Sequence, residues 1–459
     1  MTVTLAQRFA DYAAKLKFED LPSPVVHEVK RRVIDSIGCA MGSWRAEPCT
    51  IARRVAATMS AQRGAHLLGT KHLAPPDWAA FANGCLVRYL DYNDTYLSKE
   101  PAHPSDNIPA TLAAAQSAGA NGRALITAIA LAYEVQCRLC DAASIRARGW
   151  DHVTYGVFST ALAAGKVMGL DAGKLRHTVN LAGVASAALR QSRVGELSHW
   201  KGCAFANAAR QGVFAAMLAR EGMTGPAPIF EGDKGFEKLV SGPLTLAGPF
   251  AEKPQNDGFM ILRTSIKFWP AEYHAQSAVE AAMKLRGKSF NPDDVEAVII
   301  ESHDAAVDII GSEAEKWRPK SRETADHSLP YMTAVALVDG ALAQAQFDES
   351  RYTNEKLLSF VHRVEVRRNS ELSAAYPGAV ANIVTIRYRD GRTVSQRIDH
   401  PRGHSGNPMT DGEVEQKFHA QSDPILGRTR ADSVLQWLWQ LEKATRWDEL
   451  AELLLIDDA

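Results

Sequence analysis

Alanine-rich segments with a helical period dominate the first 264 residues of the chain. In residues 204–220, Phe205, Ala209 and Gly212 recur at steps of three and four, so they share one face of a helix. Small side chains on such a face allow neighbouring helices to approach closely. Further helices are expected at residues 110–119, 124–139, 158–168 and 174–189. Together these segments predict a large all-helical domain.

Short β-type patterns appear only after residue 264. Asp390-Gly391 lies between two alternating runs, which is a strong signal for a hairpin. Helical patterns then return near the end of the chain, at residues 411–420 and 431–455. The expected strands are residues 295–302, 361–367, 383–388 and 393–398, and helical stretches at 275–286 and 331–343 lie among them.

The order helix, mixed α and β, helix predicts a mainly α fold with an α+β second domain. We expect a large all-helical domain at residues 1–264, rejoined by C-terminal helices within residues 403–459. Residues 265–402 are then expected to form a smaller α+β lid domain over it.

The composition is that of a globular protein, with 459 residues, 46% hydrophobic and 23% charged. A formal net charge of -1 argues against a nucleic-acid or membrane partner. No run approaches the roughly 18 apolar residues that span a bilayer, and no signal peptide is recognisable, so a cytoplasmic location is expected. Six cysteines are scattered along the chain. Cys137 and Cys140 form one CxxC in a helix-like run, and core packing is expected for them rather than metal or redox use.

A polar stretch at residues 90–107 is the first candidate for a functional site. It contains Asp91, Thr95 and His103, and prolines interrupt it, so it forms a shaped loop rather than one helix. Sites are often built on such loops. A solvated loop with Asx turns and a helix cap explains the same residues equally well.

Histidine or lysine recurs near polar helix starts elsewhere in the chain. Each such residue alone is more often structural, but the recurrence favours a cationic pocket for a polycarboxylate, since helix N-termini also attract anions. Motifs for nucleotides, for a nucleophilic serine, for zinc or for iron–sulfur clusters are missing, so no cofactor and no metal are expected. The recurrent positions are His152, Lys201, Lys267, His274, His327 and Tyr331.

These segments together resemble the MmgE/PrpD family of 2-methylcitrate dehydratases and cis-aconitate decarboxylases. The resemblance implies a helical domain with a smaller lid domain, and a homodimer. It matches the family's active-site positions to Asp91, Thr95, His103, His152, Lys201, Lys267 and Tyr331, and it places His274 and His327 in matching motifs. The resemblance is carried by LDYNDTYL at 90–97, HPSDN at 103–107, DHV at 151–153, HWKG at 199–202, KFWPAEYHAQSAVEA at 267–281, DHSLPY at 326–331 and GHSGNPMTDGEV at 403–414.

The motifs at residues 103–107 and 273–277 are more similar to the bacterial dehydratase branch than to the animal decarboxylase branch. We therefore expect a lyase that removes water from a tertiary hydroxy-tricarboxylate, 2-methylcitrate or citrate. The alternatives are a cis-aconitate decarboxylase, a non-catalytic polycarboxylate-binding protein, and a metal-dependent hydratase with Asp91, Asp94 and His103 as hard ligands.

The residues also support a mechanism for such a dehydration. Cations must neutralise the charge that builds on a carboxylate when the neighbouring carbon loses its proton, and Lys201, Lys267 and a histidine are the candidates. Proton transfer is assigned to His103 and His152, which leaves open which one is the acid. Asp91 would orient an imidazole or act as the base. Thr95, Tyr331, His274 and His327 are assigned to substrate binding.

Overall fold

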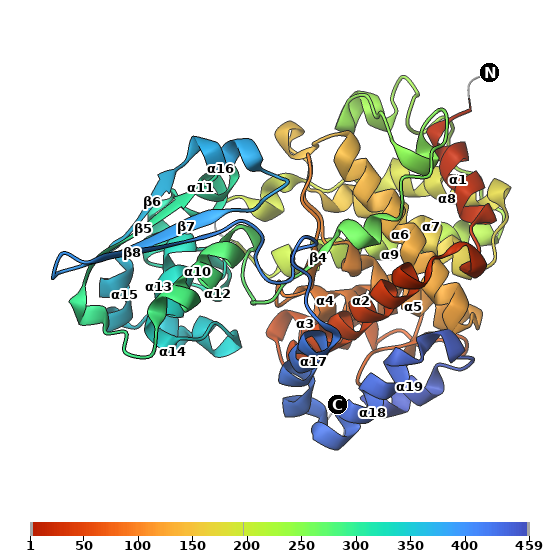
Figure 1. Ribbon diagram of the computed structural model, residues 1–459. Coiled ribbons are helices and arrows are strands. Elements are labelled where there is room, and N and C mark those ends of the chain that lie inside the picture. Colours follow the sequence, from red (N-terminus) through yellow and green to blue (C-terminus); the bar gives the residue numbers. More distant parts are fainter. Residues whose placement is uncertain (1–2, 196, 457–459) are drawn as a thin grey trace. The chain divides into compact units, whose positions relative to one another are not determined.

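The computed structural model describes residues 3–195 and 197–456, and these divide into two compact units. The helical unit comprises the described parts of residues 1–195, 199–264 and 410–459. The second unit comprises residues 197–198 and 265–409. Residues 403–409, which the sequence analysis assigned to the returning helices, therefore group with the second unit. Figure 1 shows the path of the chain through both units.

α-Helices are the main regular structure of the first unit, as the sequence predicted, and irregular segments such as residues 221–264 connect or follow them. The strands among its described residues are two residues long: β1 (Ala65–His66), β2 (Leu73–Ala74) and β3 (Asp94–Thr95). The helices are α1 (Leu5–Lys15), α2 (Ser23–Gly42), α3 (Glu47–Ala56), α4 (Pro76–Arg88), α5 (Asn107–Ala118), α6 (Gly122–Ala142), α7 (Val153–Val167), α8 (Ala172–Ala185), α9 (Trp200–Arg220), α17 (Asp411–Leu426), α18 (Arg428–Trp439) and α19 (Asp448–Leu454).

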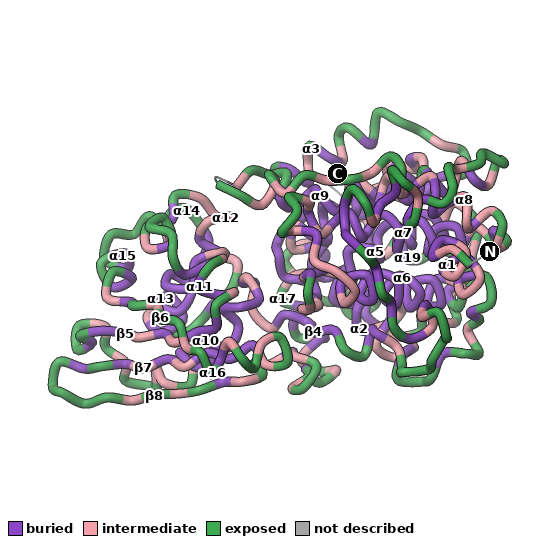
Figure 2. The backbone as a smooth tube through the Cα atoms, turned by 90° about the horizontal axis from the view of Figure 1, so that it is seen from above, coloured by how far each residue is buried: buried purple, intermediate pink, exposed green. Residues whose placement is uncertain are grey.

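The core of the helical unit is built around α7, which packs against α6, α8 and α9. Figure 2 shows this part of the chain as almost continuously buried. Close approach explains the small residues on α9. A Cβ atom on Gly212 would lie 2.9 Å from the backbone oxygen of Val157 and 2.9 Å from the backbone nitrogen of Ala161. Only glycine fits there without a shift, which confirms the small-residue face predicted for residues 204–220.

The C-terminal helices return to the helical unit, where α17 packs on α2. The buried Lys417 ammonium lies 2.6 Å from the buried Asp35 carboxylate. The prediction of one helical stretch over residues 431–455 was wrong, because the chain breaks between α18 and α19. Tertiary contacts fix that break: Trp447 Nε1 donates to the Ala120 carbonyl at 2.7 Å, and Gly122 N donates to the Ala444 carbonyl at 2.8 Å.

Both cysteines of the CxxC are buried in α6, and neither forms a disulfide. This agrees with the core-packing interpretation of Cys137 and Cys140.

The second unit contains a four-stranded sheet in the order β6-β5-β7-β8. β5 (Val295–Ser302) pairs in parallel with β6 (Val364–Arg368) and antiparallel with β7 (Asn382–Tyr388), which forms a hairpin with β8 (Thr393–Ile398). The hairpin predicted from Asp390-Gly391 is thereby confirmed. The unit also contains the two-residue strand β4 (Ser265–Ile266).

Alternate residues of β7 point into the core of this unit, where Val384 and Ile386 are fully buried. α10 packs against β7, β8 and α13, so it covers one face of the sheet. The outer strand β8 alternates between exposed and partly buried residues, as Figure 2 shows. The helices are α10 (Gln276–Arg286), α11 (Asp304–Ile310), α12 (Arg322–Ala325), α13 (Leu329–Asp339), α14 (Glu349–Tyr352), α15 (Glu355–Val361) and α16 (Ser370–Ala375).

Candidate functional site

Asp91 is the centre of a buried charge cluster in the helical unit. It lies three residues after Arg88, the last residue of α4, and Arg88 forms an ion pair with its carboxylate. Lys201, in the first turn of α9, places Nζ 3.6 Å from Asp91 Oδ2. His103 Nε2 lies 3.9 Å from Asp91 Oδ1. One buried carboxylate therefore joins an arginine, a lysine and a histidine from three segments of the chain.

The backbone of Asp91 is itself unusual. Its φ is 50°, and among the described residues it is the one non-glycine residue with a positive φ. Left-handed backbone at an ordinary residue costs free energy and is concentrated at functional sites. The strain is consistent with a carboxylate that the fold holds in one place between Arg88 and Lys201.

The tautomer of His103 follows from its hydrogen bond. Its Nδ1 lies 2.7 Å from the backbone carbonyl of Asp94, and a carbonyl oxygen can only accept. Nδ1 must therefore carry the hydrogen, and in the neutral ring Nε2 keeps its lone pair on the side of Asp91. A histidine oriented in this way can take up or release a proton at Nε2.

His152 also has its Nδ1 directed to an acceptor, in this case the Asp151 carboxylate. Its Nδ1 lies 3.0 Å from Asp151 Oδ1, while Arg193 Nε donates to Asp151 Oδ2 at 2.9 Å. Burial alone would raise the pKa of the Asp151 carboxyl, but the Arg193 guanidinium and the His152 ring hold it well below its usual range. Asp151 therefore stays ionised and fixes the ring. His152 Nε2 is buried and has no hydrogen-bond partner among the described residues.

The two imidazoles are neighbours, with ring centroids 6.0 Å apart and an interplanar angle of 60°. Each has Nδ1 directed to a fixed acceptor. A pair of this kind can serve as acid and base for one reaction. This arrangement joins two of the five residues predicted to be catalytic, from loops about fifty positions apart in the sequence.

A second layer of hydrogen bonds holds the loop that carries His103. The Asp94 carboxylate accepts from Ser105 N at 2.9 Å and from the Tyr133 hydroxyl at 2.6 Å. Thr95 is buried, and its hydroxyl donates to the Ala102 carbonyl at 3.3 Å. The solvated-loop interpretation is therefore wrong for Asp91, Asp94, Thr95 and Ser105, which are buried, although Lys99 in the same stretch is exposed.

Asp106 is a further buried carboxylate of the same loop. Asn93 Nδ2 donates to its Oδ1 at 2.7 Å, and Arg88 Nε lies 3.5 Å from its Oδ2. Burial, with a contribution from Asp94, raises the pKa of Asp106 to about 7 despite Arg88 and Asn93. Two carboxylates of this region are thus held in opposite ways, Asp151 as an anion and Asp106 near its titration point.

The second unit holds the other four expected residues. His274 Nε2 lies 3.8 Å from Glu272 Oε1, and His327 Nδ1 is hydrogen-bonded to Asp326. The Lys267 side chain, just after β4, is 1% exposed. Tyr331 is fully buried in the hydrophobic core, and its hydroxyl donates to the Gln346 carbonyl at 2.6 Å. That hydroxyl can still accept a hydrogen bond, and its assignment to substrate binding stays a prediction.

Sequence reasoning missed several groups that organise the helical-unit cluster. Arg88 precedes Asp91 by three positions, a spacing that can bring two side chains together on a helical turn, but no helix was predicted there. Asp151 is adjacent to His152 in sequence, yet nothing in the pattern distinguishes a carboxylate that orients a ring from one in a helix cap. Tyr133 gave no signal, because it lies within an apolar helix.

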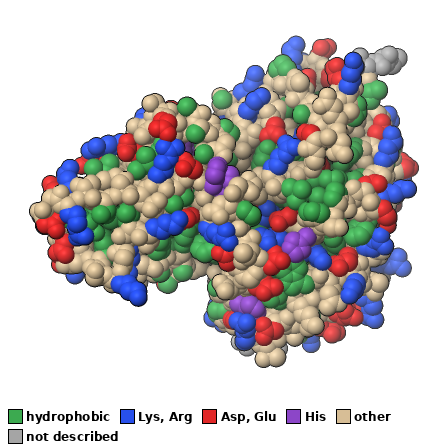
Figure 3. Space-filling view, in the orientation of Figure 1, with side chains coloured by type: hydrophobic (Ala, Val, Ile, Leu, Met, Phe, Trp, Pro, Cys, Tyr) green, Lys and Arg blue, Asp and Glu red, His purple; other side chains and the backbone are tan. Residues whose placement is uncertain are grey.

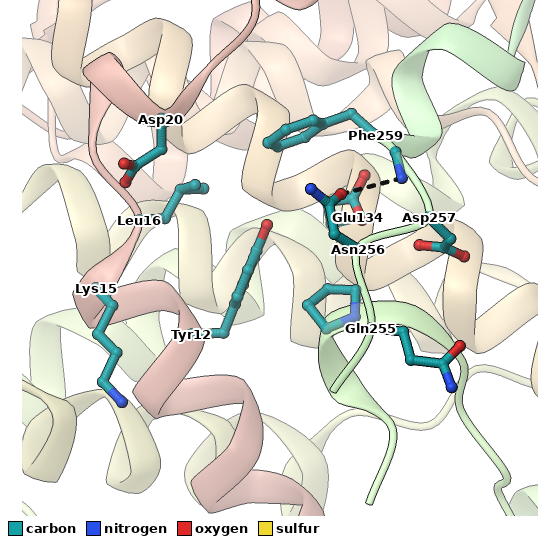
Figure 4. Close-up of a pocket in the computed structure, with 11 residues that line it drawn as sticks. Tyr12, Lys15, Leu16, Asp20, Glu134, Gln255, Asn256, Asp257 and Phe259 are labelled. Carbon is teal, nitrogen blue, oxygen red and sulfur yellow. Dashed lines mark hydrogen bonds between the residues drawn. The ribbon is translucent and has the colours of Figure 1, made fainter. Parts of the chain in front are cut away.

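The pocket drawn in Figure 4 lies outside the predicted site. A pocket of about 270 Å³ in the helical unit, shown in Figure 4, is lined by residues such as Tyr12, Glu134 and Phe259 and by none of the predicted site residues. Within residues 3–195 and 197–456, no three His, Cys, Asp or Glu side chains are grouped to hold a metal ion. No described helix is long and apolar enough to cross a bilayer. On the face seen in Figure 3, positive and negative side chains are interspersed.

Comparison with known proteins identifies the class to which this fold and site belong. The MmgE/PrpD N-terminal domain matches residues 7–247, and the MmgE/PrpD C-terminal domain matches residues 269–441. The chain therefore belongs to the MmgE/PrpD family, as the sequence motifs predicted.

Named relatives include hydro-lyases that act on citrate-type acids. The 2-methylcitrate dehydratase of Cupriavidus necator is 30% identical over 414 residues, which are 84% of this chain and 83% of the relative. That of Escherichia coli (strain K12) is 28% identical, with 81% of this chain and 80% of the relative covered. An alkylcitrate dehydratase from a fungal species is 29% identical, with 84% and 81% covered.

Proposed function

We propose that this protein is a hydro-lyase that removes water from a citrate-type tertiary hydroxy-tricarboxylate, 2-methylcitrate or citrate, without a metal or an organic cofactor. The arrangement of the Asp91 cluster carries the proposal. Two imidazoles with fixed Nδ1 hydrogens lie side by side, and Lys201 lies at the carboxylate that one of them faces. The dehydratase names of the relatives support the reaction class.

The residues of this cluster account for each proton in the reaction. One imidazole takes the proton from the carbon next to a substrate carboxylate through Nε2, and the electron pair of that C–H bond becomes the new carbon–carbon double bond. The tertiary C–O bond breaks, and the second imidazole donates a proton so that water leaves. Which of His103 and His152 is the base remains open in this proposal.

Charge stabilisation is the other requirement. Proton abstraction adds negative charge to a carboxylate that is already anionic, and fixed cations lower the energy of that state more than any other single effect. Lys201 is the cation of the helical unit that we assign to it. Arg88 also forms an ion pair with Asp91, so Lys201 is not the only cation at that carboxylate.

We assign the remaining predicted residues on the resemblance and on their chemistry. Lys267 is proposed as a second cation for the substrate carboxylates. Thr95, Tyr331, His274 and His327 are proposed to bind substrate oxygens. His274 and His327 each lie beside a carboxylate, and either imidazole can bind an anionic acid when it is protonated.

Mass analysis of products tests the reaction class. The metal-stripped protein is incubated with 2-methylcitrate, citrate and cis-aconitate in separate reactions. Loss of one water molecule from either hydroxy acid supports the proposal. Loss of carbon dioxide from cis-aconitate alone would replace it with a decarboxylase, and activity that returns only with a divalent cation would favour the metal-dependent hydratase. Saturable citrate binding with no product would indicate a binding protein.

We also propose that the protein is a homodimer, following the family resemblance. Trp200 and Phe214 on α9 are 47% and 45% exposed, and their spacing puts them on the same side of that helix. Exposed aromatic side chains are common at interfaces between subunits. Sedimentation velocity of the wild type and of a Phe214→Asp variant tests this, since a dimer that uses α9 would dissociate on introduction of the charge.

A further inference from the structure

His303 is a buried histidine that has no part in the site described above. It joins β5 to α11, and its side chain is fully buried. Its backbone carbonyl accepts from Ala306 N at 3.1 Å and from Val307 N at 3.2 Å, so the backbone begins the helix. Neither ring nitrogen has a hydrogen-bond partner among the described residues. A buried imidazole in that condition destabilises the fold compared with an apolar side chain of similar size.

The ring of His303 is packed between two other rings. Tyr376 stacks on it, with centroids 4.5 Å apart and planes 15° from parallel. His274 meets it edge to face, with centroids 4.9 Å apart and an interplanar angle of 68°. His274 and Tyr376 are also close, at 5.6 Å. The three rings thus form one cluster within the second unit, and His274 is the member that lies in the family motif.

Hydrogen bonds hold the backbone of His274 on both sides. Its amide donates to Glu272 Oε2 at 2.8 Å, and its carbonyl accepts from Asn382 Nδ2 at 2.8 Å. With the backbone held on both sides, the side-chain torsions decide where the imidazole points. The contacts with His303 and Tyr376 limit those torsions.

We propose that His303 is a positioning residue, whose ring holds the His274 imidazole in the orientation it uses toward an anionic substrate. This rests on the proposed function, in which His274 binds a substrate carboxylate. An aliphatic side chain would fill the space, but it would not provide a flat face against the edge of His274.

Charged and titratable groups face both His303 and His274. Burial lowers the pKa of His303 to about 3, with a further contribution from His274 against the opposing effect of Asp304. Asp304 also pairs with Arg368 at 3.1 Å, so its charge is partly compensated. His274 faces the Glu272 carboxylate at 3.8 Å, besides His303 and Tyr376. Two imidazolium ions this close would repel each other, and a neutral His303 adds no positive charge beside His274.

Titration of His274 by NMR, in full-length protein with isotope-labelled histidine and no substrate, tests the proposal. A His274→Asn variant identifies its signal. In His303→Ala we expect the midpoint of His274 to move by about half a pH unit or more, because the ring is released to solvent or toward Glu272. His303→Phe keeps an aromatic face and is expected to restore most of the wild-type curve. His362→Ala, an exposed histidine of the same unit, should leave it unchanged.

Kinetics of the same variants provide the second readout. We expect KM for the tricarboxylate to rise about tenfold in His303→Ala with a smaller change in kcat, which is the pattern of lost substrate binding. A His303→Ala protein that melts at a lower temperature but keeps the His274 titration and KM of the wild type would overturn the proposal. If that variant does not fold, His303→Leu replaces it with the same two outcomes. A wild type that dehydrates none of the acids would overturn the proposed function and leave the titration test intact.

Discussion

The two units carry their predicted functional residues in different ways. In the helical unit, Asp91 joins Lys201 and His103 directly, and His152 lies beside His103. In the second unit, His274 is held by rings, His327 by its neighbour Asp326, and Tyr331 by the hydrophobic core. The helical unit therefore contains a connected set of charges before any substrate binds. In the second unit, His274, His327 and Tyr331 each have a different supporting contact.

From this difference we expect proton transfer in the helical unit and substrate binding in the second unit. Proton transfer needs groups whose distances are fixed in advance, and connected buried charges provide that. Binding of carboxylates tolerates independent groups. We therefore expect substitutions in the helical-unit cluster to lower kcat, and substitutions in the second unit to act mainly on KM or on stability.

The largest effect is expected from loss of the His152 ring. His152→Ala should lower kcat by about 10²- to 10⁴-fold, the usual contribution of a general acid or base, without a comparable rise in KM. Steady-state kinetics with the preferred acid measure this. The control is His199→Ala, since the His199 side chain is 51% exposed at the start of α9. A wild-type kcat in His152→Ala would contradict the assignment of proton transfer to His152.

A smaller loss is expected when the ring remains but its partner is neutralised. Asp151→Asn replaces a carboxylate that accepts from His152 Nδ1 with an amide that can donate, which favours the wrong tautomer. We expect kcat to fall between about 10-fold and 100-fold, as for other groups that orient a histidine. A fall in melting temperature with unchanged kcat would mean that Asp151 serves only the fold.

Stability tests whether the helical unit is as tightly packed as the cluster requires. Gly212→Ala places a Cβ 2.9 Å from the backbone of α7 and should lower the free energy of unfolding by about 1–3 kcal/mol. Gly412→Ala in α17 is the matched control, because a Cβ there meets no atom within 4 Å. It is expected to be neutral or to stabilise by up to about 1 kcal/mol. Denaturant unfolding of both variants compares them.

The pH dependence of stability tests the buried Asp106. Its pKa is raised to about 7 in the folded protein, against an ordinary value of 3.8, so between these values the folded state binds the extra proton. Stability from this group is therefore lost as pH rises, with a slope of at most about 1.4 kcal/mol per pH unit. Asp106→Asn lacks that slope, so its stability relative to the wild type should increase from about pH 4 to about pH 7. A pH-independent difference would contradict the raised pKa.

The smallest effect is expected in the second unit. Tyr331→Phe removes a hydroxyl that donates to the Gln346 carbonyl, which should cost about 0.5–1.5 kcal/mol of stability. If the same hydroxyl also binds substrate, KM rises as well, and kcat changes little. A large fall in kcat would weaken the division of roles between the two units.

The sequence predicted the helices and the sheet well, because the hydrophobic period changes from helical to alternating at one place. It could not predict the break between α18 and α19, since Trp447 makes the decisive contact with Ala120, far away in sequence. The same distinction between local patterns and contacts distant in sequence applies to the site. Histidines and lysines were visible as types in motifs. The pairing of Arg193 with the Asp151 carboxylate, and of Tyr133 with the Asp94 carboxylate, joins different elements and becomes visible only in the fold.

Ultraviolet absorbance is the direct test of whether the protein dehydrates a citrate-type acid without a metal. The metal-stripped protein is mixed with citrate and with 2-methylcitrate in separate cuvettes, with a chelator present. Dehydration creates a double bond conjugated to a carboxylate. We expect absorbance to rise with at least one acid. The rise should be abolished in His152→Ala and retained in His199→Ala. A flat trace with both acids, from a folded protein, would contradict it.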